Sequence, residues 1–196
     1  TETLPEPEGQ PDLNDQMEIS EVKAEPFSCD TADVLDFSDL EDFNTYEALS
    51  DAKANFDPEA GSSGTLGLAR AYLALGLGDE ALDILHSEKS AAGQRLKQVA
   101  KIIAFPEVRP DEPVLSEYKN CSAVASLWAF LEAPTQFSDP LKMTDIRNIY
   151  YAVDDFPPIL KERVLITSAI VAAESNHGNV AQYIWERLEN KAREDG

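Results

Sequence analysis

The sequence predicts an all-α protein built from short antiparallel helix pairs. Apolar side chains recur at intervals of three and four residues along most of the chain, which is the spacing of one face of an α-helix. Proline and glycine stand where these stretches begin and end, because proline suits the first turn of a helix and glycine readily ends one. A pattern of small residues also recurs 100 positions later, which is typical of repeated helix pairs.

The first segment is predicted to be an acidic tail. Residues 1–26 combine Pro, Glu, Asp and Gln with almost no aromatic side chain, so they bury too little apolar surface to offset the entropy of ordering. We therefore expect a disordered tail or linker at 1–26 and an all-helical domain at 27–196. Apolar side chains between Phe27 and Phe56 predict one or two short amphipathic helices that pack on this domain.

The clearest predicted helix pair spans residues 66–85. Its first helix is expected to end at Gly76 or Gly78, since glycine adopts the left-handed conformation that terminates helices. Each helix follows a side chain that can accept a hydrogen bond from the first turn. These expected caps are Ser63 or Thr65 for the first helix and Asp79 for the second.

The remaining helices are bounded by prolines and polar caps, and we expect them at residues 90–104, 113–132, 140–153, 157–175 and 179–193. The helix at 157–175 is apolar on most sides, so it is expected to be the central and most buried one. In the last helix, Val180, Ile184 and Leu188 share one face and are expected to point inward.

The pair at 66–85 resembles a tetratricopeptide repeat. The residues at the family's small and aromatic positions are Leu68, Ala69, Tyr72, Gly76, Ala81 and Leu85. Two positions depart from the pattern: Thr65 stands where the family prefers Trp, and Gly93 stands where it prefers Pro. The resemblance implies a short solenoid in which stacked antiparallel helix pairs present a surface to a protein partner.

A weaker echo of this repeat lies at residues 168–185. Ala169, Gly178, Ala181 and Trp185 correspond to the residues numbered 100 lower, which are Ala69, Gly78, Ala81 and Leu85. In such repeats each helix pair buries its apolar face against its neighbours. The echo therefore predicts a tetratricopeptide-like α-solenoid with irregular repeats between the two pairs.

The net charge of −21 is concentrated at the front of the chain. Residues 1–60 hold eighteen acidic and two basic side chains, whereas residues 61–196 hold nineteen and fourteen. We call residues 1–60 the acidic arm. Phosphate backbones repel such an arm, so we expect no nucleic-acid binding and a protein partner that can be basic. No apolar stretch is long enough to span a membrane, so no membrane insertion is expected. The oligomeric state is left open.

The two cysteines, Cys29 and Cys121, are candidates for a disulfide. Neither belongs to a metal-binding spacing, and a bridge between them would tie the acidic arm to the helical body. Two unrelated buried thiols are the alternative. Because disulfides persist in oxidising compartments, the pair favours a periplasmic or otherwise exported protein, with a cytoplasmic location as the alternative. Since residue 1 is Thr, we expect that something upstream was removed.

The sequence offers little for catalysis. His86 and His177 stand at predicted helix ends without a nucleophile or metal motif, and no cofactor or metal site is expected. Glu174 is the strongest enzymatic alternative, because AIVAAESNHGN resembles the helix-end Glu-Ser motif of lytic transglycosylases, in which a buried Glu protonates the glycosidic oxygen. The glycine-rich and Met-Gln segments of that family are missing here.

Candidate partner-binding residues come from the acidic arm and from exposed aromatics. Aspartates recur at every third position from Asp30 to Asp39, but the glycine and glutamate of a calcium loop are missing. Among these aspartates, Asp36 and Asp39 are candidates for contact with a basic partner. Tyr150 and Tyr151 are adjacent and cannot both face inward on one helix, so one is expected to be exposed. Trp128, Trp185 and Tyr183 are interpreted as core, with a partner groove as the alternative.

The interpretation we favour is a non-catalytic protein–protein interaction module of an exported or cell-envelope protein. The concave surface of its helical repeats or its acidic arm would bind the partner. A structural spacer domain of a larger envelope protein is the first alternative, and a fragment of a peptidoglycan lytic transglycosylase that uses Glu174 is the second.

Overall fold

The computed structural model describes residues 29–110, 112–137, 148 and 150–194. All regular structure in these residues is helical, which confirms the all-α class. The α-helices are α1 (Tyr46–Ala54), α2 (Ser62–Ala74), α3 (Gly78–Leu85), α4 (Ala91–Ala104), α5 (Ala123–Glu132), α7 (Pro158–Glu174) and α8 (Gly178–Glu194). The 3₁₀ helices are η1 (Cys29–Leu35), η2 (Ser38–Leu40), η3 (Pro58–Ala60), η4 (Leu115–Tyr118) and η5 (Pro134–Gln136).

Two predicted segments fall wholly or largely outside the described residues. They are the tail at 1–26 and the helix at 140–153, of which residues 148, 150 and 151 are described and helical.

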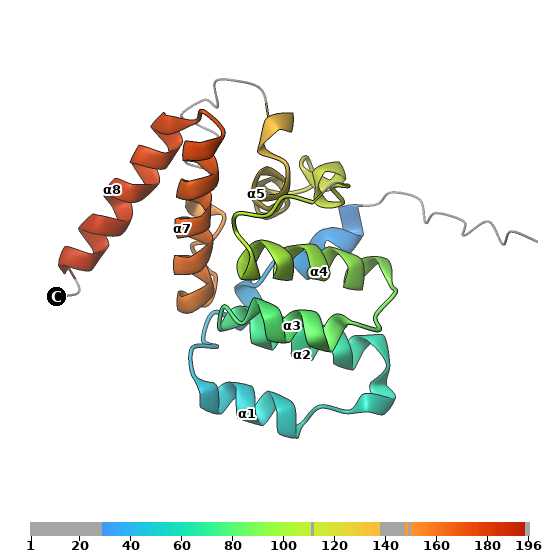
Figure 1. Ribbon diagram of the computed structural model, residues 1–196. Coiled ribbons are helices and arrows are strands. Elements are labelled where there is room, and N and C mark those ends of the chain that lie inside the picture. The colour runs from blue at the N-terminus through green and yellow to red at the C-terminus, as the bar shows by residue number, and fades with distance from the viewer. Residues whose placement is uncertain (1–28, 111, 138–147, 149, 195–196) are drawn as a thin grey trace, which may run out of the picture.

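The helices pack mainly on their neighbours in sequence. Helix α2 packs on α3, α3 on α4, and α7 on α8. Figure 1 shows α1 to α4 lying in successive layers, with the α7–α8 pair standing beside them. Helix α7 contacts α2, α4 and α5, so it joins the second pair to the first. The described chain is thus a set of packed helix pairs around one main core.

The core is centred on α5 and includes the segment after η1. Trp128, Phe37 and Phe156 form an aromatic cluster with ring centroids 5.6 to 6.3 Å apart. Their side chains are almost wholly buried. Because one member comes from before α1, one from α5 and one from before α7, the cluster joins three parts of the chain that are distant in sequence.

The prediction that the helix at 157–175 is the most buried one is wrong. The observed helix, α7, starts and ends within one residue of the prediction, but Ile159, Ile166 and Ile170 are exposed on one of its faces. Helix α5 is buried on more sides. The reason is tertiary: α8, α2, α4 and α5 pack on other faces of α7, and no described helix covers the face that carries these three isoleucines.

The predicted caps of the clearest pair are also wrong. Helix α2 already starts at Ser62, so Ser63 and Thr65 lie inside its first turn, where the Thr65 hydroxyl donates to the Gly61 carbonyl at 3.3 Å. Asp79 lies inside the first turn of α3 and makes no capping bond. Both helices begin earlier than predicted because the preceding turns lead directly into them.

The predicted helix at 113–132 is divided in two. Helix η4 and α5 are separated by a turn, and the Ser122 hydroxyl caps α5 by accepting a hydrogen bond from the Ala125 N–H at 3.0 Å. The helix predicted at 90–104 is confirmed, with Ser90 as its cap. Periodicity alone did not reveal that Ser122 restarts the helix.

The two helix pairs α2–α3 and α7–α8 share the same turn. Gly76 and Asn176 both have a positive φ, 69° and 62°, one residue after the C-cap. The next N–H reaches back five residues in both pairs, from Leu77 to the Tyr72 carbonyl at 3.0 Å and from His177 to the Ala172 carbonyl at 2.8 Å. This is the Schellman termination of a helix. The predicted helix end at Gly76 is confirmed.

Candidate functional site

The predicted disulfide is present. Cys29 and Cys121 are bonded across a sequence separation of 92 residues, with their Cα atoms 5.3 Å apart. The bond ties the start of η1 to the turn before α5. It therefore ties the chain at Cys29, just after the predicted tail at 1–26, to the helical body, as the sequence predicted.

Asp36 and Asp39 lie together on the side of α2, where both contact Arg70. The two Arg70 Nη atoms bond the Asp39 carboxylate, with Nη1 3.0 Å from Oδ2. Arg70 also donates to the Asp36 carbonyl, and the Asp36 carboxylate accepts from the Ser38 N–H at 2.9 Å. These bonds hold η1 and η2 against α2, so both candidates have an internal structural role.

Tyr150 and Tyr151 differ in exposure, as their adjacency predicts. Tyr151 is 58% exposed, whereas Tyr150 is partly buried against Tyr183, with ring centroids 6.3 Å apart. The guanidinium of Arg187 lies 5.5 Å from the ring centroids of both Tyr150 and Tyr183, which is a cation–π arrangement. Of the two tyrosines, Tyr151 is the one accessible to a partner.

Glu174 does not have the buried setting of a transglycosylase acid. It is the last residue of α7, its side chain is 54% exposed, and it pairs with Arg109 at 3.3 Å. A general acid of that kind depends on an apolar pocket that keeps it protonated. The local sequence motif is therefore not accompanied by the environment that its chemistry requires.

The two histidines are at helix ends, as predicted. His86 is exposed after α3, and its carbonyl accepts from Lys97 Nζ at 3.2 Å. His177 is buried in the α7–α8 turn, where its ring packs on Phe130 with centroids 5.9 Å apart. Both lie within the helical scaffold, and neither lines the groove described below.

Glu132 is a buried acid that the sequence analysis missed. Its carboxylate accepts from the N–H groups of Val114, Leu115 and Ser116 at 2.8, 2.6 and 3.1 Å. Burial raises the pKa of Glu132 above its ordinary value of 4.5, and the three hydrogen bonds oppose this rise. The carboxylate thus fixes the start of η4 to the end of α5, which is a structural role.

The part of the chain that the structure describes holds no group of three or more His, Cys, Asp or Glu side chains placed to bind a metal ion. Within the same residues, no helix combines the length and the apolar character that crossing a membrane requires.

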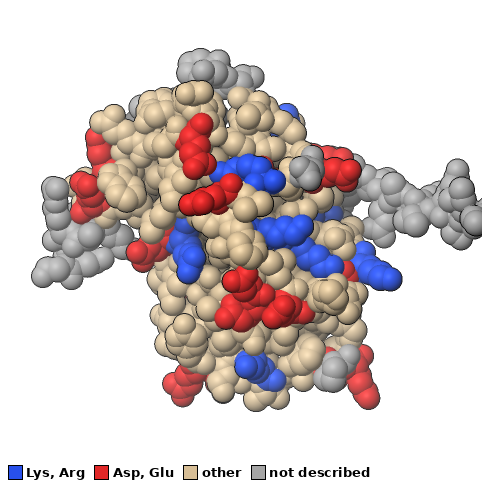
Figure 2. Space-filling view, in the orientation of Figure 1, with Lys and Arg blue, Asp and Glu red and all other residues tan. Residues whose placement is uncertain are grey.

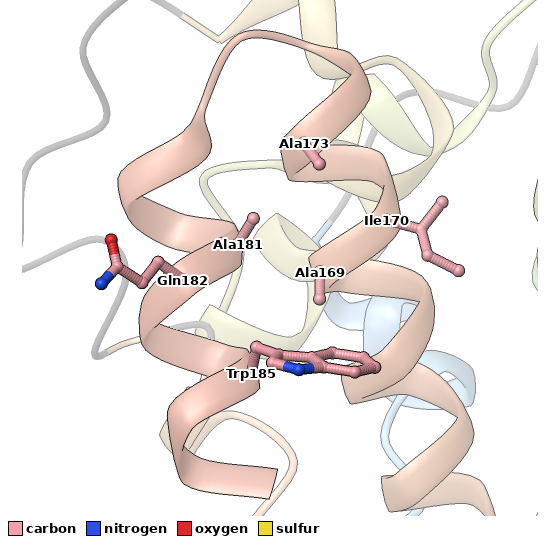
Figure 3. Close-up of a pocket in the computed structure, with 6 residues that line it drawn as sticks. All are labelled: Ala169, Ile170, Ala173, Ala181, Gln182 and Trp185. Carbon is pink, nitrogen blue, oxygen red and sulfur yellow. The ribbon is translucent and has the colours of Figure 1, made fainter. Parts of the chain in front are cut away.

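An apolar groove lies between α7 and α8 (Figure 3). It encloses about 350 Å³ and is lined by Ala169, Ile170, Ala173, Ala181, Gln182 and Trp185. Figure 3 shows the three alanines facing the gap between the two helices, with the Trp185 indole lying across one end. Trp185 is 51% exposed. A half-exposed tryptophan beside small side chains is a common anchor of protein interfaces.

The apolar surface continues from this groove along α7. A second hollow of about 360 Å³ shares Ile170 with the groove. It is lined further by Ile159, Ile166 and Pro106 and by the polar side chains of Glu162, Arg163 and Thr167. Monomeric proteins rarely expose extended apolar patches without a binding role. The α7–α8 face is therefore the strongest candidate for a partner-binding surface among the described residues.

The sequence analysis identified this surface only in part. It named Trp185 as a possible groove residue but favoured core packing, and it expected Ile170 to be buried. One signal was available: Trp185 lies off the inward stripe of Val180, Ile184 and Leu188 on the same helix. That offset distinguishes Trp185 from Trp128, which is fully buried in α5.

Charged side chains of both signs are interspersed on the visible face of the molecule (Figure 2). A group of acidic side chains lies over α3, and basic side chains lie above it. The strongly negative net charge therefore does not appear as one continuous field on this face.

Comparison with known proteins identified no relative of this chain. No family model matches the chain, and no curated protein or solved structure is significantly similar to it.

Proposed function

We propose that this chain is a non-catalytic protein–protein interaction module that binds a partner through the groove between α7 and α8. The observation that carries the proposal is the half-exposed Trp185 beside an apolar groove in a helical scaffold. Burial of such a groove by a partner removes apolar surface from water, which is the main driving force of association. The exposed Tyr151 and the acidic arm are additional candidates for contact with a basic partner.

The finer architecture that we propose is a short tetratricopeptide-like solenoid. Its support is the pair of helical hairpins with the same turn, at Gly76 and at Asn176, which lie 100 residues apart as the sequence repeat does. Small residues stand at the corresponding positions Ala69 and Ala169, where close approach of two helices requires them. In such an array each pair offers one face to the next element, which leaves a face available for a partner.

We also propose that the protein is exported or belongs to the cell envelope. The Cys29–Cys121 disulfide supports this location, because thiols of cytosolic proteins are kept reduced. The test is to trap thiols by alkylation in intact cells before lysis and to count labelled cysteines by mass spectrometry. Unlabelled cysteines that become reactive after reduction support export, whereas two labelled cysteines overturn it.

The partner proposal is tested with a photo-crosslinking residue placed at Gln182, on the rim of the groove, in the full chain in its native cells. The matched control carries the crosslinker at Glu80, which is exposed on α3 away from the groove. We expect a discrete crosslinked protein from position 182 that is lost in Trp185→Ala and absent from position 80. If position 182 yields no crosslinked protein, the binding function fails and the spacer alternative replaces it.

A further inference from the structure

The groove between α7 and α8 occupies a surface that is filled on the other helix pair. The shared turn aligns the two pairs with an offset of 100 residues. The residues of α2 and α3 that correspond to the groove lining are Ala69, Arg70, Leu73, Ala81, Leu82 and Leu85. Of these, Ala69, Leu73, Ala81 and Leu85 are fully buried. Ala169 is buried as well, but Ala173 and Trp185, which correspond to Leu73 and Leu85, are exposed. This part of the surface is therefore core in the first pair and exposed in the second.

Helix α4 contributes to this difference, because it packs on both α2 and α3. The backbone of α4 comes close to Gly78, the first residue of α3. A Cβ added to Gly78 would lie 2.7 Å from the carbonyl oxygen of Ala100 and 2.7 Å from the backbone N of Ala104. The absence of a side chain at Gly78 is what allows the α4 backbone to come so close.

The second pair has the same glycine, and within the described residues no helix lies against it. A Cβ added to Gly178 would meet no atom within 4 Å. Trp185, which corresponds to the fully buried Leu85, is 51% exposed, and Ile170 and Ala173 are exposed beside it. The second pair thus presents the surface on which α4 packs in the first pair, with the same glycine and with no covering helix among the residues that the structure describes.

We propose that the α7–α8 groove binds an amphipathic α-helix of a partner protein, seated as α4 is seated on α2 and α3. This inference rests on the proposed binding function and specifies its ligand. The docked helix presents an aliphatic stripe to Trp185 and the alanines of the groove. It brings a small residue or bare backbone to Gly178, as α4 brings Ala100 and Ala104 to Gly78.

The polar face of the partner helix is basic. On the outer side of α8, Gln182, Trp185, Glu186 and Glu189 are exposed at helical spacing and share one face. Two of these four are carboxylates, and none is basic. On helix α4 itself, the internal counterpart of the ligand, Lys101 is exposed and Lys97 is partly exposed, whereas Arg95 is buried and donates to the Tyr118 hydroxyl at 2.6 Å. Opposite charges across such a rim favour the encounter and fix the orientation of the helix.

A second copy of this chain is a poorer occupant. Symmetric pairing of two α7–α8 faces would bring Glu186 and Glu189 of one copy toward the same residues of the other, and like charges across an interface are unfavourable. Helix α4, which has the right chemistry, is already packed within its own chain. A helix supplied by a different protein avoids both difficulties.

The test uses the full chain and a synthetic helix as the probe. The probe is a fluorescent peptide of residues 90–105, held helical by a staple that replaces Gln94 and Gln98. These two residues are not part of the aliphatic stripe of α4, and they line an open hollow that also includes Leu82 of α3. We expect saturable one-to-one binding by fluorescence anisotropy. Gly178→Ala and Trp185→Ala should each weaken it by about tenfold, which corresponds to about 1.4 kcal/mol.

Matched controls separate docking from unspecific adhesion. Val108→Ala removes apolar atoms from a side chain that is exposed outside the groove and should leave the affinity unchanged. A peptide in which Leu96, Val99 and Ile103 are replaced by Ser lacks the aliphatic stripe and should not bind. If the carboxylates on α8 attract the basic face of the peptide, a peptide with Lys101→Glu should bind more weakly. This loss of affinity should be smaller at high salt, because salt screens the attraction.

Several results would overturn the inference. They are no binding at millimolar peptide, equal binding to the Gly178→Ala and Trp185→Ala variants, or sedimentation as a dimer that Trp185→Ala dissociates. Failure of the peptide alongside a Trp185-dependent crosslinked partner would remove the helix inference and leave the binding function standing. Failure of the peptide together with the absence of any crosslinked partner would remove both.

Discussion

The indole N–H of Trp128 donates a hydrogen bond to the carbonyl oxygen of Leu35, 3.0 Å away and 93 residues distant in sequence. Both residues are fully buried. This bond and the nearby Cys29–Cys121 disulfide connect the segment before α1 to the centre of the core. The segment before α1, for which the sequence predicts short amphipathic helices and a disulfide, is therefore anchored to the domain at two neighbouring places.

Replacement of Trp128 by Phe should lower the free energy of unfolding by about 2 to 3 kcal/mol. Phe leaves the buried Leu35 carbonyl without its donor and leaves part of the indole volume empty. The matched control is Trp185→Phe, because Trp185 is half exposed and should change stability by no more than about 0.5 kcal/mol. Urea denaturation measures both, and equal effects of the two substitutions would contradict the assignment.

Loss of the disulfide should lower the free energy of unfolding by about 4 to 5 kcal/mol in the chain-entropy model, because the bond closes a loop across 92 residues. The measurement compares the wild type with Cys29→Ser/Cys121→Ser by denaturation. A reducing agent should destabilise the wild type by a similar amount and leave the double variant unchanged. A reducing agent that shifts neither protein would show that the bond contributes nothing to stability.

Replacement of Glu132 by Gln should destabilise the protein by about 2 kcal/mol at neutral pH. The amide places an NH₂ group against backbone N–H donors that the carboxylate now satisfies. Glu117→Gln, an exposed change on the same 3₁₀ helix, is the control and should be nearly neutral. Thermal unfolding at neutral pH distinguishes the two.

The pH dependence of Glu132 follows from its raised pKa. Because the folded-state pKa lies above the unfolded value, the native state binds more protons between the two. The contribution of Glu132 to the free energy of unfolding therefore rises as the pH falls through the folded pKa, and it is complete below about 4.5. As the pH falls over this range, the difference in free energy of unfolding between wild type and Glu132→Gln should widen. A difference that narrows would show that folding lowers the pKa of Glu132.

Alanine at the two equivalent glycines should have opposite consequences. Gly78→Ala forces a Cβ against the backbone of Ala100 and Ala104, so it should destabilise by about 1 to 3 kcal/mol. Gly178→Ala meets open space and should leave the melting temperature unchanged or raise it, because alanine favours the helix. If the two variants have the same melting temperature, α4 does not pack closely on Gly78.

Local chemistry in the sequence determined much of the fold. The helices at 90–104, 157–175 and 179–193 and the helix end at Gly76 depend on apolar periodicity, proline and glycine, which act within one or two turns. The pairing of Cys29 with Cys121 followed from there being two cysteines in all. The break before Ser122 escaped prediction because its neighbours still carry helical spacing.

The tertiary structure alone decided which apolar faces are covered. Ile166 and Ile170 have the same local pattern as buried residues, and Trp185 stands where its counterpart Leu85 is core. Their exposure depends on whether another helix lies against them, as α4 lies against α2 and α3. Burial is a property of the neighbours that a residue meets in space, and periodicity within one helix records only which residues share a face.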